Sequence, residues 1–309
     1  MAFAFLFPGQ GSQSLNMMDG FVGVAQVRET FDEAQAVLGL DLWGMLRAES
    51  PEAINATVNT QPLMLAAGVA TWRAWLAAGG ARPSVLAGHS LGEYSALVAA
   101  DALTFADALR LVRVRAEAMQ EAVPSGTGAM AAILGLPDEV IREVCLSVQQ
   151  DEVVEAVNFN SPGQVVIAGS RAAVERAMAA CKAAGAKRAL PLPVSVPSHC
   201  ALMKPAALRL ERELENVVIQ TPSIEVLHNA DVAGYRDAAQ IRDALVRQLF
   251  SPVRWTETVA RMAGDGVTLM AECGPGKVLA GLAKRIDANV KCLALTDAQA
   301  LNSALTELV

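Results

Sequence analysis

The sequence predicts an α/β protein with a mostly parallel sheet that is covered by helices on both faces and interrupted by a smaller unit. Short apolar segments alternate with longer segments of helical periodicity over most of the chain, and this alternation is typical of parallel strands joined by helices. Between residues 126 and 193 the expected order becomes strand, helix, strand, strand, helix, strand, which is the ferredoxin-like pattern. We therefore expect a large domain made of residues 1–125 and 194–309, and a small ferredoxin-like domain made of residues 126–193.

The first part of the large domain should supply two strands and several helices. Thr60 is a potential cap for a long helix with Pro62 in its first turn, and Thr104 is a potential cap for a later helix. In chain order, the expected elements are a strand at 2–7, two helical stretches of which the second ends at Gly79, a strand at 84–87, and helices at 94–100 and from Thr104 to about Val123.

The remaining elements follow from the same periodicities. In the small domain we expect strands at 129–134, 153–158, 164–168 and 187–192, and helices at 137–148 and 170–184. In the last part of the chain we expect strands at 224–227, 268–272 and 291–295, and helices at 201–214, 238–248, 253–262 and 278–286.

Composition excludes several classes of function. The chain has 309 residues, of which 53% are hydrophobic and 18% charged, so it can bury a large core. A net charge of −7 without a block of Lys and Arg argues against nucleic acid as the partner. Five cysteines without a Cys-x-x-Cys motif favour a reducing compartment over disulfides or a zinc site. We expect no signal peptide and no membrane span, and therefore a cytoplasmic protein.

A Gly-x-Ser-x-Gly motif at 88–92 is the most informative feature of the chain. An apolar strand segment precedes it and a helix-forming segment follows, which is the context of a nucleophile elbow. The tight turn presents Ser90 at its tip, and a serine in this position usually carries an acyl group. Ser90 is a weak nucleophile unless a base takes its proton.

The chain has three histidines that are candidates for this base. His89 is adjacent to Ser90, and neighbouring side chains diverge at such a turn, so a structural role is favoured. His228 follows an expected strand, and a core or loop position is favoured over a role in catalysis. His199 ends an extended segment, because Pro197 disfavours helix before it, and it lies where the chain re-enters the large domain. We favour His199 as the base.

The position of His199 bears on the reaction class. A serine hydrolase places an acidic residue after the serine and its histidine near the carboxyl end, but His199 lies well before the end of this chain. A backbone carbonyl or a side-chain amide could orient the imidazole instead. The oxyanion could be bound by the N–H of Leu91 and by the glycine-rich turn at 8–11. That turn also matches part of a dinucleotide fingerprint, an interpretation we disfavour because Ser14 replaces the third glycine.

Arg115 is the candidate for binding an acidic acyl group. It lies at the edge of the apolar stripe of its expected helix, near Met119. From the pattern alone, a surface or ion-paired arginine is favoured. If the side chain points toward Ser90, its guanidinium fork suits a substrate carboxylate.

These residues, taken with others along the chain, resemble the acyltransferase family of fatty acid and polyketide synthesis. The matching segments run in order over nearly the whole sequence: Phe7–Gln13, Asn59–Leu63, Gly88–Leu97, Arg115 with Met119, Asn158–Gly169, Val194–His199, Gln248–Trp255 and Glu272–Leu279. Together they make the resemblance highly specific.

The resemblance implies an α/β-hydrolase-like large domain with the ferredoxin-like insert. It implies transfer of a malonyl group from malonyl-CoA to acyl carrier protein without a metal or other cofactor. The implied roles are nucleophile for Ser90, base for His199, oxyanion hole for the N–H groups of Gln10 and Leu91, carboxylate binding for Arg115, acyl-pocket lining for Met119 and imidazole orientation by the carbonyl of Gln248. A serine esterase or thioesterase of the α/β-hydrolase type is the alternative, and a non-catalytic scaffold for the carrier protein is a second one.

An acidic carrier protein would need a local basic patch on this acidic chain. Two pairs of basic residues are candidates because each pair is adjacent in sequence, Lys187 with Arg188 and Lys284 with Arg285. Scattered, solvated charges are an equally acceptable interpretation of these residues.

Overall fold

The computed structural model describes residues 2–124, 126–194 and 196–308. Residues 1, 125 and 309 of the expected domain boundaries, and residue 195 of the segment before His199, lie outside the described residues. Within the described residues, no helix is both long and apolar enough to cross a membrane.

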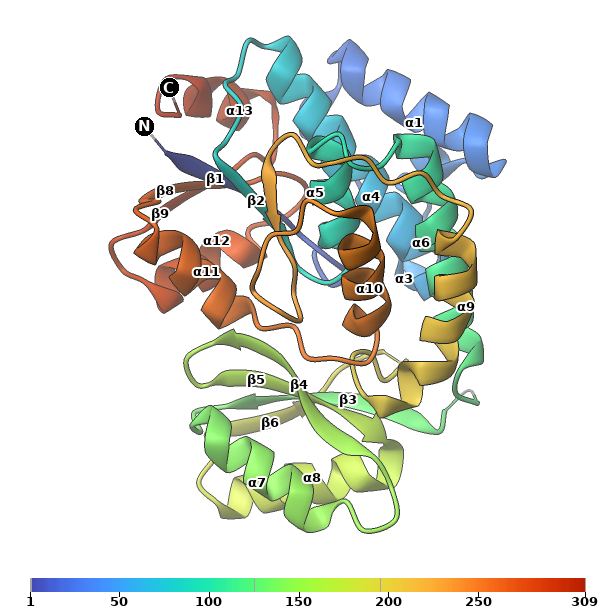
Figure 1. Cartoon of the computed structure of the whole chain (residues 1–309), viewed down its shortest axis with the longest axis vertical. Coiled ribbons are helices and arrows are strands. Elements are labelled where there is room, and N and C mark those ends of the chain that lie inside the picture. Colours follow the sequence, from blue (N-terminus) through green and yellow to red (C-terminus); the bar gives the residue numbers. More distant parts are fainter. Residues whose placement is uncertain (1, 125, 195, 309) are drawn as a thin grey trace.

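A five-stranded sheet forms the centre of the larger part of the molecule (Figure 1). Its strands, in spatial order, are β7 (Glu225–Leu227), β2 (Val85–Gly88), β1 (Phe3–Phe7), β8 (Leu269–Glu272) and β9 (Lys291–Ala294). Every neighbouring pair is parallel, which confirms the expected mostly parallel sheet. All residues of β1 and β2 are buried, as strands covered on both faces require.

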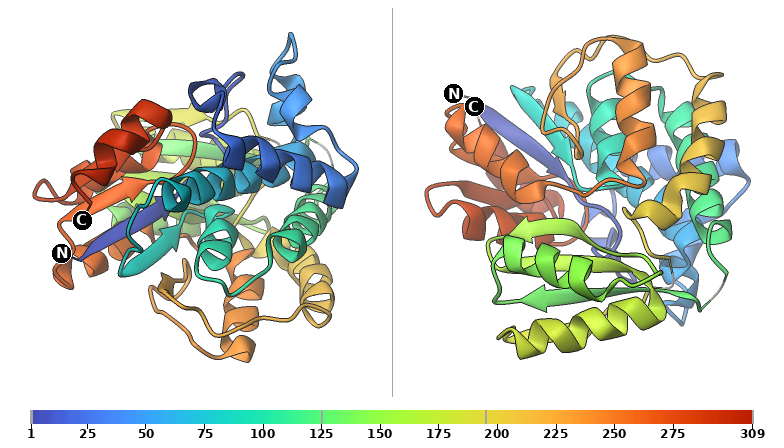
Figure 2. Two further views of the ribbon diagram at one scale, coloured as in Figure 1. Left: turned by 90° about the horizontal axis from the view of Figure 1, so that it is seen from above. Right: turned by 60° about the horizontal axis from the view of Figure 1, so that its bottom comes forward.

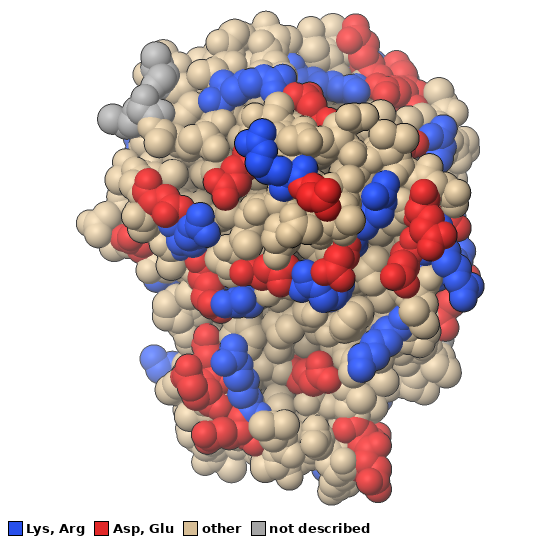
Figure 3. All heavy atoms as spheres, in the orientation of Figure 1, with Lys and Arg blue, Asp and Glu red and all other residues tan. Residues whose placement is uncertain are grey.

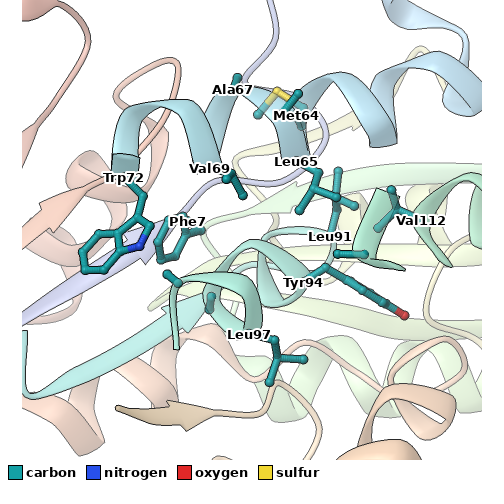
Figure 4. Packing of buried hydrophobic residues seen from close by; sticks show 14 of the residues in the cluster. Phe7, Met64, Leu65, Ala67, Val69, Trp72, Leu91, Tyr94, Leu97 and Val112 are labelled. Atoms are coloured by element: carbon teal, nitrogen blue, oxygen red, sulfur yellow. The ribbon is translucent and has the colours of Figure 1, made fainter. Parts of the chain in front are cut away.

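Helices cover both faces of this sheet (Figure 2). Phe3, Phe5 and Phe7 of β1 join the core beneath α1 (Ala25–Leu38), α4 (Thr57–Ala77), α5 (Gly92–Ala99) and α6 (Phe105–Glu121). Ala4 and Leu6 join the core beneath α11 (Trp255–Gly264) and α12 (Val278–Ile286). Figure 4 shows side chains of α4 and α5 meeting around Phe7. The other helices of this part are α2 (Leu42–Met45), α3 (Glu52–Asn55), α9 (Lys204–Leu214), α10 (Ala238–Gln248) and α13 (Ala298–Leu305).

Helix α4 begins earlier than its sequence signals indicate. Thr60 was expected to cap it, but the helix starts at Thr57, and the Thr60 hydroxyl donates to the carbonyl of Ile54 at 2.6 Å. Pro62 therefore lies inside the helix and leaves the carbonyl of Val58 without its usual N–H donor. Arg113 Nη1 of α6 donates to that carbonyl at 3.0 Å, so a tertiary contact compensates the proline.

A second, antiparallel sheet occupies the middle of the sequence and lies at the bottom of Figure 1. Its strands and helices follow in the chain order β3 (Gly128–Leu134), α7 (Asp138–Val148), β4 (Val154–Ser161), β5 (Gln164–Ser170), α8 (Arg171–Ala183) and β6 (Arg188–Pro191). The spatial order is β4-β5-β3-β6, and α7 and α8 pack on one face. β4 extends three residues beyond its expected end because it pairs with β5 up to Ser161.

The two sheets are joined through β4. The N–H of Phe159 donates to the carbonyl of Val253 at 3.0 Å, and the N–H of Val253 donates to the carbonyl of Val157 at 2.8 Å. These bonds attach the edge of the small sheet to the segment that enters α11. They hold the end of β4 beside the carboxyl ends of the strands of the large sheet.

Candidate active site

The Gly-x-Ser-x-Gly segment forms a tight turn between β2 and α5, and Ser90 has a left-handed backbone with φ of +51°. Only glycine fits at either side of it. A Cβ on Gly88 would lie 1.9 Å from the carbonyl carbon of Gly92, and a Cβ on Gly92 would lie 2.0 Å from the carbonyl oxygen of Phe7. The turn is thus pressed against the end of β1, and Ser90 is held at its tip.

His199 lies beside Ser90, with Nε2 2.7 Å from Ser90 Oγ. Its Nδ1–H donates to the backbone carbonyl of Gln248 at 2.7 Å, which leaves Nε2 free to accept the serine proton. The backbone N–H of His199 donates to the backbone carbonyl of Leu249 at 3.0 Å. Burial and the nearby charge of Arg115 lower the pKa of His199 to about 3. The imidazole is therefore neutral in the free protein and available as a base.

Arg115 of α6 points into the same site and is only 1% exposed. Its Nη1 donates to Gln61 Oε1 at 2.8 Å, and its Nη2 donates to Gln248 Oε1 at 3.0 Å and to Ser90 Oγ at 3.2 Å. Burial lowers the pKa of Arg115, but a guanidinium remains charged in proteins. Within the part of the chain that the structure describes, the charge has no carboxylate in direct contact, so a carboxylate of a ligand can pair with it.

Met119 lies one turn after Arg115 on α6 and is also buried. Its sulfur is 3.5 Å from Nε2 of Gln61, the residue whose oxygen binds Arg115. Met119 and Gln61 therefore form the part of the site that lies between α4 and α6.

The turn after β1 packs against the nucleophile turn. A Cβ on Gly9 would lie 2.4 Å from the carbonyl oxygen of His89 and 3.7 Å from the amide nitrogen of Leu91, so only glycine fits there. Among the residues described, no protein acceptor binds the N–H of Gln10 or that of Leu91. Both amides are thus available to a ligand, whereas the Gln10 side chain donates to Thr57 Oγ1 at 3.4 Å.

The other two histidines bind partners away from the Ser90 hydroxyl. His89 Nε2 is 2.8 Å from Oδ1 of Asn160, which lies near the end of β4, and burial lowers the pKa of His89. His228 is fully buried and its Nδ1 is 2.7 Å from Glu93 Oε1. Of the three histidines, only His199 contacts Ser90 Oγ.

Several residues of this site were missed in the sequence. Asn229 Oδ1 accepts the N–H of Ser90 at 2.6 Å, and Asn229 Nδ2 donates to the carbonyl of Gly88 at 2.7 Å. Gln61 and the side chain of Gln248 hold Arg115. Asn229 had a usable signal, because it closely follows β7, and the carboxyl ends of parallel strands surround sites in open α/β sheets. The two glutamines lie in segments that match the acyltransferase family, Asn59–Leu63 and Gln248–Trp255, but helical periodicity alone gave their side chains no role.

The arrangement combines a serine, a neutral imidazole, two unpaired amides and a guanidinium that no carboxylate of the described residues contacts directly. A serine whose proton passes to a histidine can attack a thioester or ester carbonyl, and amides beside it can bind the resulting oxyanion. A charged guanidinium at 3.2 Å from the nucleophile selects acyl groups that carry a negative charge. The geometry thus suits acyl transfer from an acidic donor.

Comparisons with known proteins agree with this chemistry. The malonyl CoA-acyl carrier protein transacylase of Salmonella typhimurium is 57% identical over 306 residues, which cover 99% of each chain. The Bacillus subtilis protein of the same name is 42% identical over 99% of this chain and 96% of its own length.

Solved structures are equally similar. The acyl-carrier-protein S-malonyltransferase of Burkholderia pseudomallei has a TM-score of 0.97 at 56% identity, over 99% of this chain and 100% of that one. A malonyl-transacylase in complex with its type II polyketide acyl carrier protein has a TM-score of 0.97 at 54% identity, with the same coverage. The family model of the acyl transferase domain matches residues 4–294, and the chain therefore belongs to the acyl transferase family.

Proposed function

We propose that this protein transfers the malonyl group of malonyl-CoA to the phosphopantetheine thiol of acyl carrier protein and so supplies fatty acid biosynthesis. The observation that carries the proposal is the buried Arg115 guanidinium, 3.2 Å from Ser90 Oγ and in contact only with neutral acceptors. The relatives named malonyl CoA-acyl carrier protein transacylase support the same donor and acceptor.

In the first half of the reaction Ser90 Oγ attacks the thioester carbonyl while His199 Nε2 takes the hydroxyl proton. The N–H groups of Gln10 and Leu91 stabilise the oxyanion of the tetrahedral intermediate. The intermediate collapses to malonyl-Ser90, and the CoA sulfur leaves with the proton from His199. The carbonyl of Gln248 keeps the imidazole in the required tautomer throughout.

In the second half the thiol of acyl carrier protein takes the place of CoA. His199 removes the thiol proton, and the sulfur attacks the carbonyl of malonyl-Ser90. His199 then returns the proton to Ser90 Oγ as the ester bond breaks. Arg115 holds the malonyl carboxylate in both halves, beside Met119, and the proposed route needs no metal or other cofactor.

The test is to incubate the protein with malonyl-CoA, with and without a carrier thiol, and to follow both CoA release and protein mass. We expect a covalent malonyl adduct on Ser90 that persists without acceptor and disappears when the carrier thiol is added. Continuous CoA release without acceptor would instead identify a thioesterase. Failure to form any adduct would leave only a scaffold role, and an adduct in Ser90→Ala would place the nucleophile elsewhere.

We further propose the finer description of the fold and setting. The βαββαβ order with spatial order β4-β5-β3-β6 supports a ferredoxin-like small domain at 126–193, inserted into an α/β-hydrolase-like domain of residues 1–125 and 194–309. The five unpaired cysteines support a cytoplasmic location.

The two basic pairs are proposed as the docking patch for the carrier protein. Strand pairing places Gln164 opposite Leu134 and Leu134 opposite Arg188, while Arg285 Nη1 donates to Gln164 Oε1 at 2.7 Å. Both pairs therefore lie at one end of the small sheet, and Asn160 of the same hairpin binds His89 beside the nucleophile.

A further inference from the structure

A buried carboxylate lies directly beneath the nucleophile turn and takes no part in the reaction described above. Glu93 is in the first turn of α5 and its side chain is fully buried. Oε1 faces His228 Nδ1 at 2.7 Å, and Oε2 accepts the N–H of Asn229 at 2.9 Å and Nε2–H of Gln248 at 2.9 Å. Glu93 thus joins three residues from two other segments of the chain.

Two of these residues, Asn229 and Gln248, form hydrogen bonds with the backbone of Ser90. Asn229 Oδ1 accepts the N–H of Ser90 at 2.6 Å, and Gln248 Nε2 donates to the carbonyl of Ser90 at 2.9 Å. A left-handed backbone is unfavourable for a non-glycine residue, so it persists only where the surroundings impose it. The two amides impose it on Ser90. Glu93 binds the side-chain amide of Gln248 and the backbone N–H of Asn229.

The orientation of the Gln248 amide follows from the chemistry of its neighbours. Glu93 Oε2 and the carbonyl of Ser90 can only accept hydrogen bonds, so the NH2 group must face them. Gln248 Oε1 then faces Arg115 Nη2, which can only donate. Glu93 and the Ser90 carbonyl together therefore fix the acceptor that holds Arg115 beside Ser90 Oγ.

We propose that Glu93 is the positioning residue of this site: through Asn229 and Gln248 it sets the Ser90 backbone and the Arg115 guanidinium relative to each other. The proposal rests on the proposed function for the meaning of Arg115, because only an acidic acyl group requires that alignment. Glu93 itself touches none of the reacting atoms, and it acts by accepting hydrogen bonds.

The experiment measures single-turnover acylation of Ser90 by malonyl-CoA in the full chain, with mass spectrometry as the readout and thermal melting for stability. Glu93→Met removes both acceptor oxygens and with them the contacts to His228, Asn229 and Gln248. Glu93→Gln retains an oxygen that can still accept from Asn229 and Gln248 if its NH2 group faces His228. Glu272→Gln is the matched control, because Glu272 is also fully buried but binds the N–H of Ala280 at 2.9 Å, in α12.

We expect Glu93→Met to slow acylation by roughly 100-fold or more, since small misplacements of reacting groups have effects of this size. Glu93→Gln should slow it by roughly 5- to 20-fold, because neutral acceptors form weaker hydrogen bonds than carboxylates. Glu272→Gln should stay within about two-fold of the wild type, whatever its effect on melting. If Glu93→Met does not fold, Glu93→Gln decides alone, and an acylation rate within about two-fold of the wild type overturns the proposal.

A double-mutant cycle separates positioning from general support of the fold. If Glu93 acts through Gln248, Glu93→Gln should slow acylation by a smaller factor in a Gln248→Met background than in the wild type. The backbone carbonyl that orients His199 is present in both backgrounds. Equal factors in the two backgrounds would reject the connection through Gln248 and with it the proposal.

Failure of the inference can be told apart from failure of the proposed function. A small fluorophosphonate labels an activated serine irrespective of acyl preference, so its rate of reaction with each variant reports Ser90 alone. If malonyl-CoA leaves the wild type unlabelled while the fluorophosphonate labels it, the proposed function fails and the reagent still tests Glu93. If both label the wild type and every Glu93 variant at the same rate, the inference fails.

Discussion

At the scale of single residues, the site keeps a charged group and a neutral base side by side. Arg115 and His199 both lie against Ser90 Oγ, and the guanidinium is one cause of the low pKa of His199. Burial is the main cause of this low pKa, and the cation that would bind the acyl carboxylate lowers it further. Two predictions at this scale follow from the two groups.

Arg115→Ala should lower the kcat/KM for malonyl-CoA by roughly 100-fold or more, because the malonyl carboxylate would lose its partner in a buried site. The kcat/KM for acetyl-CoA should fall less, so the ratio of malonyl to acetyl transfer decreases. Steady-state kinetics with both donors measure the ratio. An unchanged ratio would show that Arg115 does not recognise the acyl group.

The kcat/KM for malonyl-CoA should show no decline near pH 6.5, because the pKa of His199 in the free protein is about 3. The base form of His199 is then present throughout the range from about pH 8 to about pH 4.5. The same shift affects the free energy of unfolding. Between pH 6.5, the ordinary pKa of a histidine in the unfolded chain, and about pH 3, the pKa of His199 in the folded protein, the unfolded chain binds the proton and the folded one does not. The stability of the fold therefore decreases as the pH falls through this range. An inflection near pH 6.5 in kcat/KM that disappears in His199→Ala would contradict the prediction.

At the scale of elements, the type and order of the helices and strands were predicted better than the residues at which they begin and end. The strands and most helices were predictable because their apolar spacing is regular, and the Thr104 cap of α6 is confirmed by its hydroxyl accepting the N–H of Asp107 at 3.0 Å. The start of α4 was wrong because Arg113 compensates Pro62 from another helix. Helix α13 was missed although Asp297 caps it by accepting the N–H of Ala300 at 2.7 Å.

The site follows the same division. Ser90 was predictable because an elbow has a local signature, and His199 because few histidines compete for its role. The burial of Arg115 could not be predicted, because the helical pattern alone favours a surface position. The residues that contact Arg115 come from α4 and α10, which are distant from it in sequence. The hydrogen bonds of Glu93 with Asn229 and Gln248 join residues that are more than a hundred positions apart, so no local sequence pattern predicts them.

Thr104→Ala tests how far α6 depends on its cap. We expect the free energy of unfolding to fall by about 1 kcal/mol, the usual effect of removing a helix cap. The ratio of malonyl to acetyl transfer should not change, because Arg115 lies near the middle of α6 and is fixed by Gln61 and Gln248. Chemical denaturation with the two kinetic assays measures both quantities. A changed ratio would mean that the cap sets the position of Arg115.

At the scale of the whole molecule, the net charge of −7 would repel an acyl carrier protein that is also acidic. Basic and acidic side chains are interspersed on the face shown in Figure 3. Many charged side chains of the molecule form ion pairs with each other, such as Arg113 with Glu117, Arg209 with Glu121 and Arg247 with Asp243. Attraction to a carrier protein therefore depends on a local group of charges rather than on the overall field. The proposed group includes Lys284 and Arg285, which are exposed at the end of α12.

Replacing both Lys284 and Arg285 by Glu should raise the KM for acyl carrier protein by roughly 10-fold and weaken its dependence on salt concentration, because rim charges act mainly on association. The KM for malonyl-CoA and the rate of Ser90 acylation should change by less than about two-fold. The matched control is Arg28→Glu with Arg47→Glu, two exposed arginines that lie beside Trp43. Unaltered carrier-protein kinetics would reject the patch.

The distance in sequence between Ser90 and His199 has a consequence for the synthesis of the chain. The two residues are 109 positions apart, and the small antiparallel sheet is made entirely between them. On the ribosome, the serine emerges well before the imidazole that would activate it, and Asn229 and Gln248 come later still. The nascent polypeptide therefore carries an inert hydroxyl at this position. The Ser90 hydroxyl becomes reactive only when its contacts with His199, Asn229 and Gln248 have formed, so covalent labelling of Ser90 reports the completion of folding.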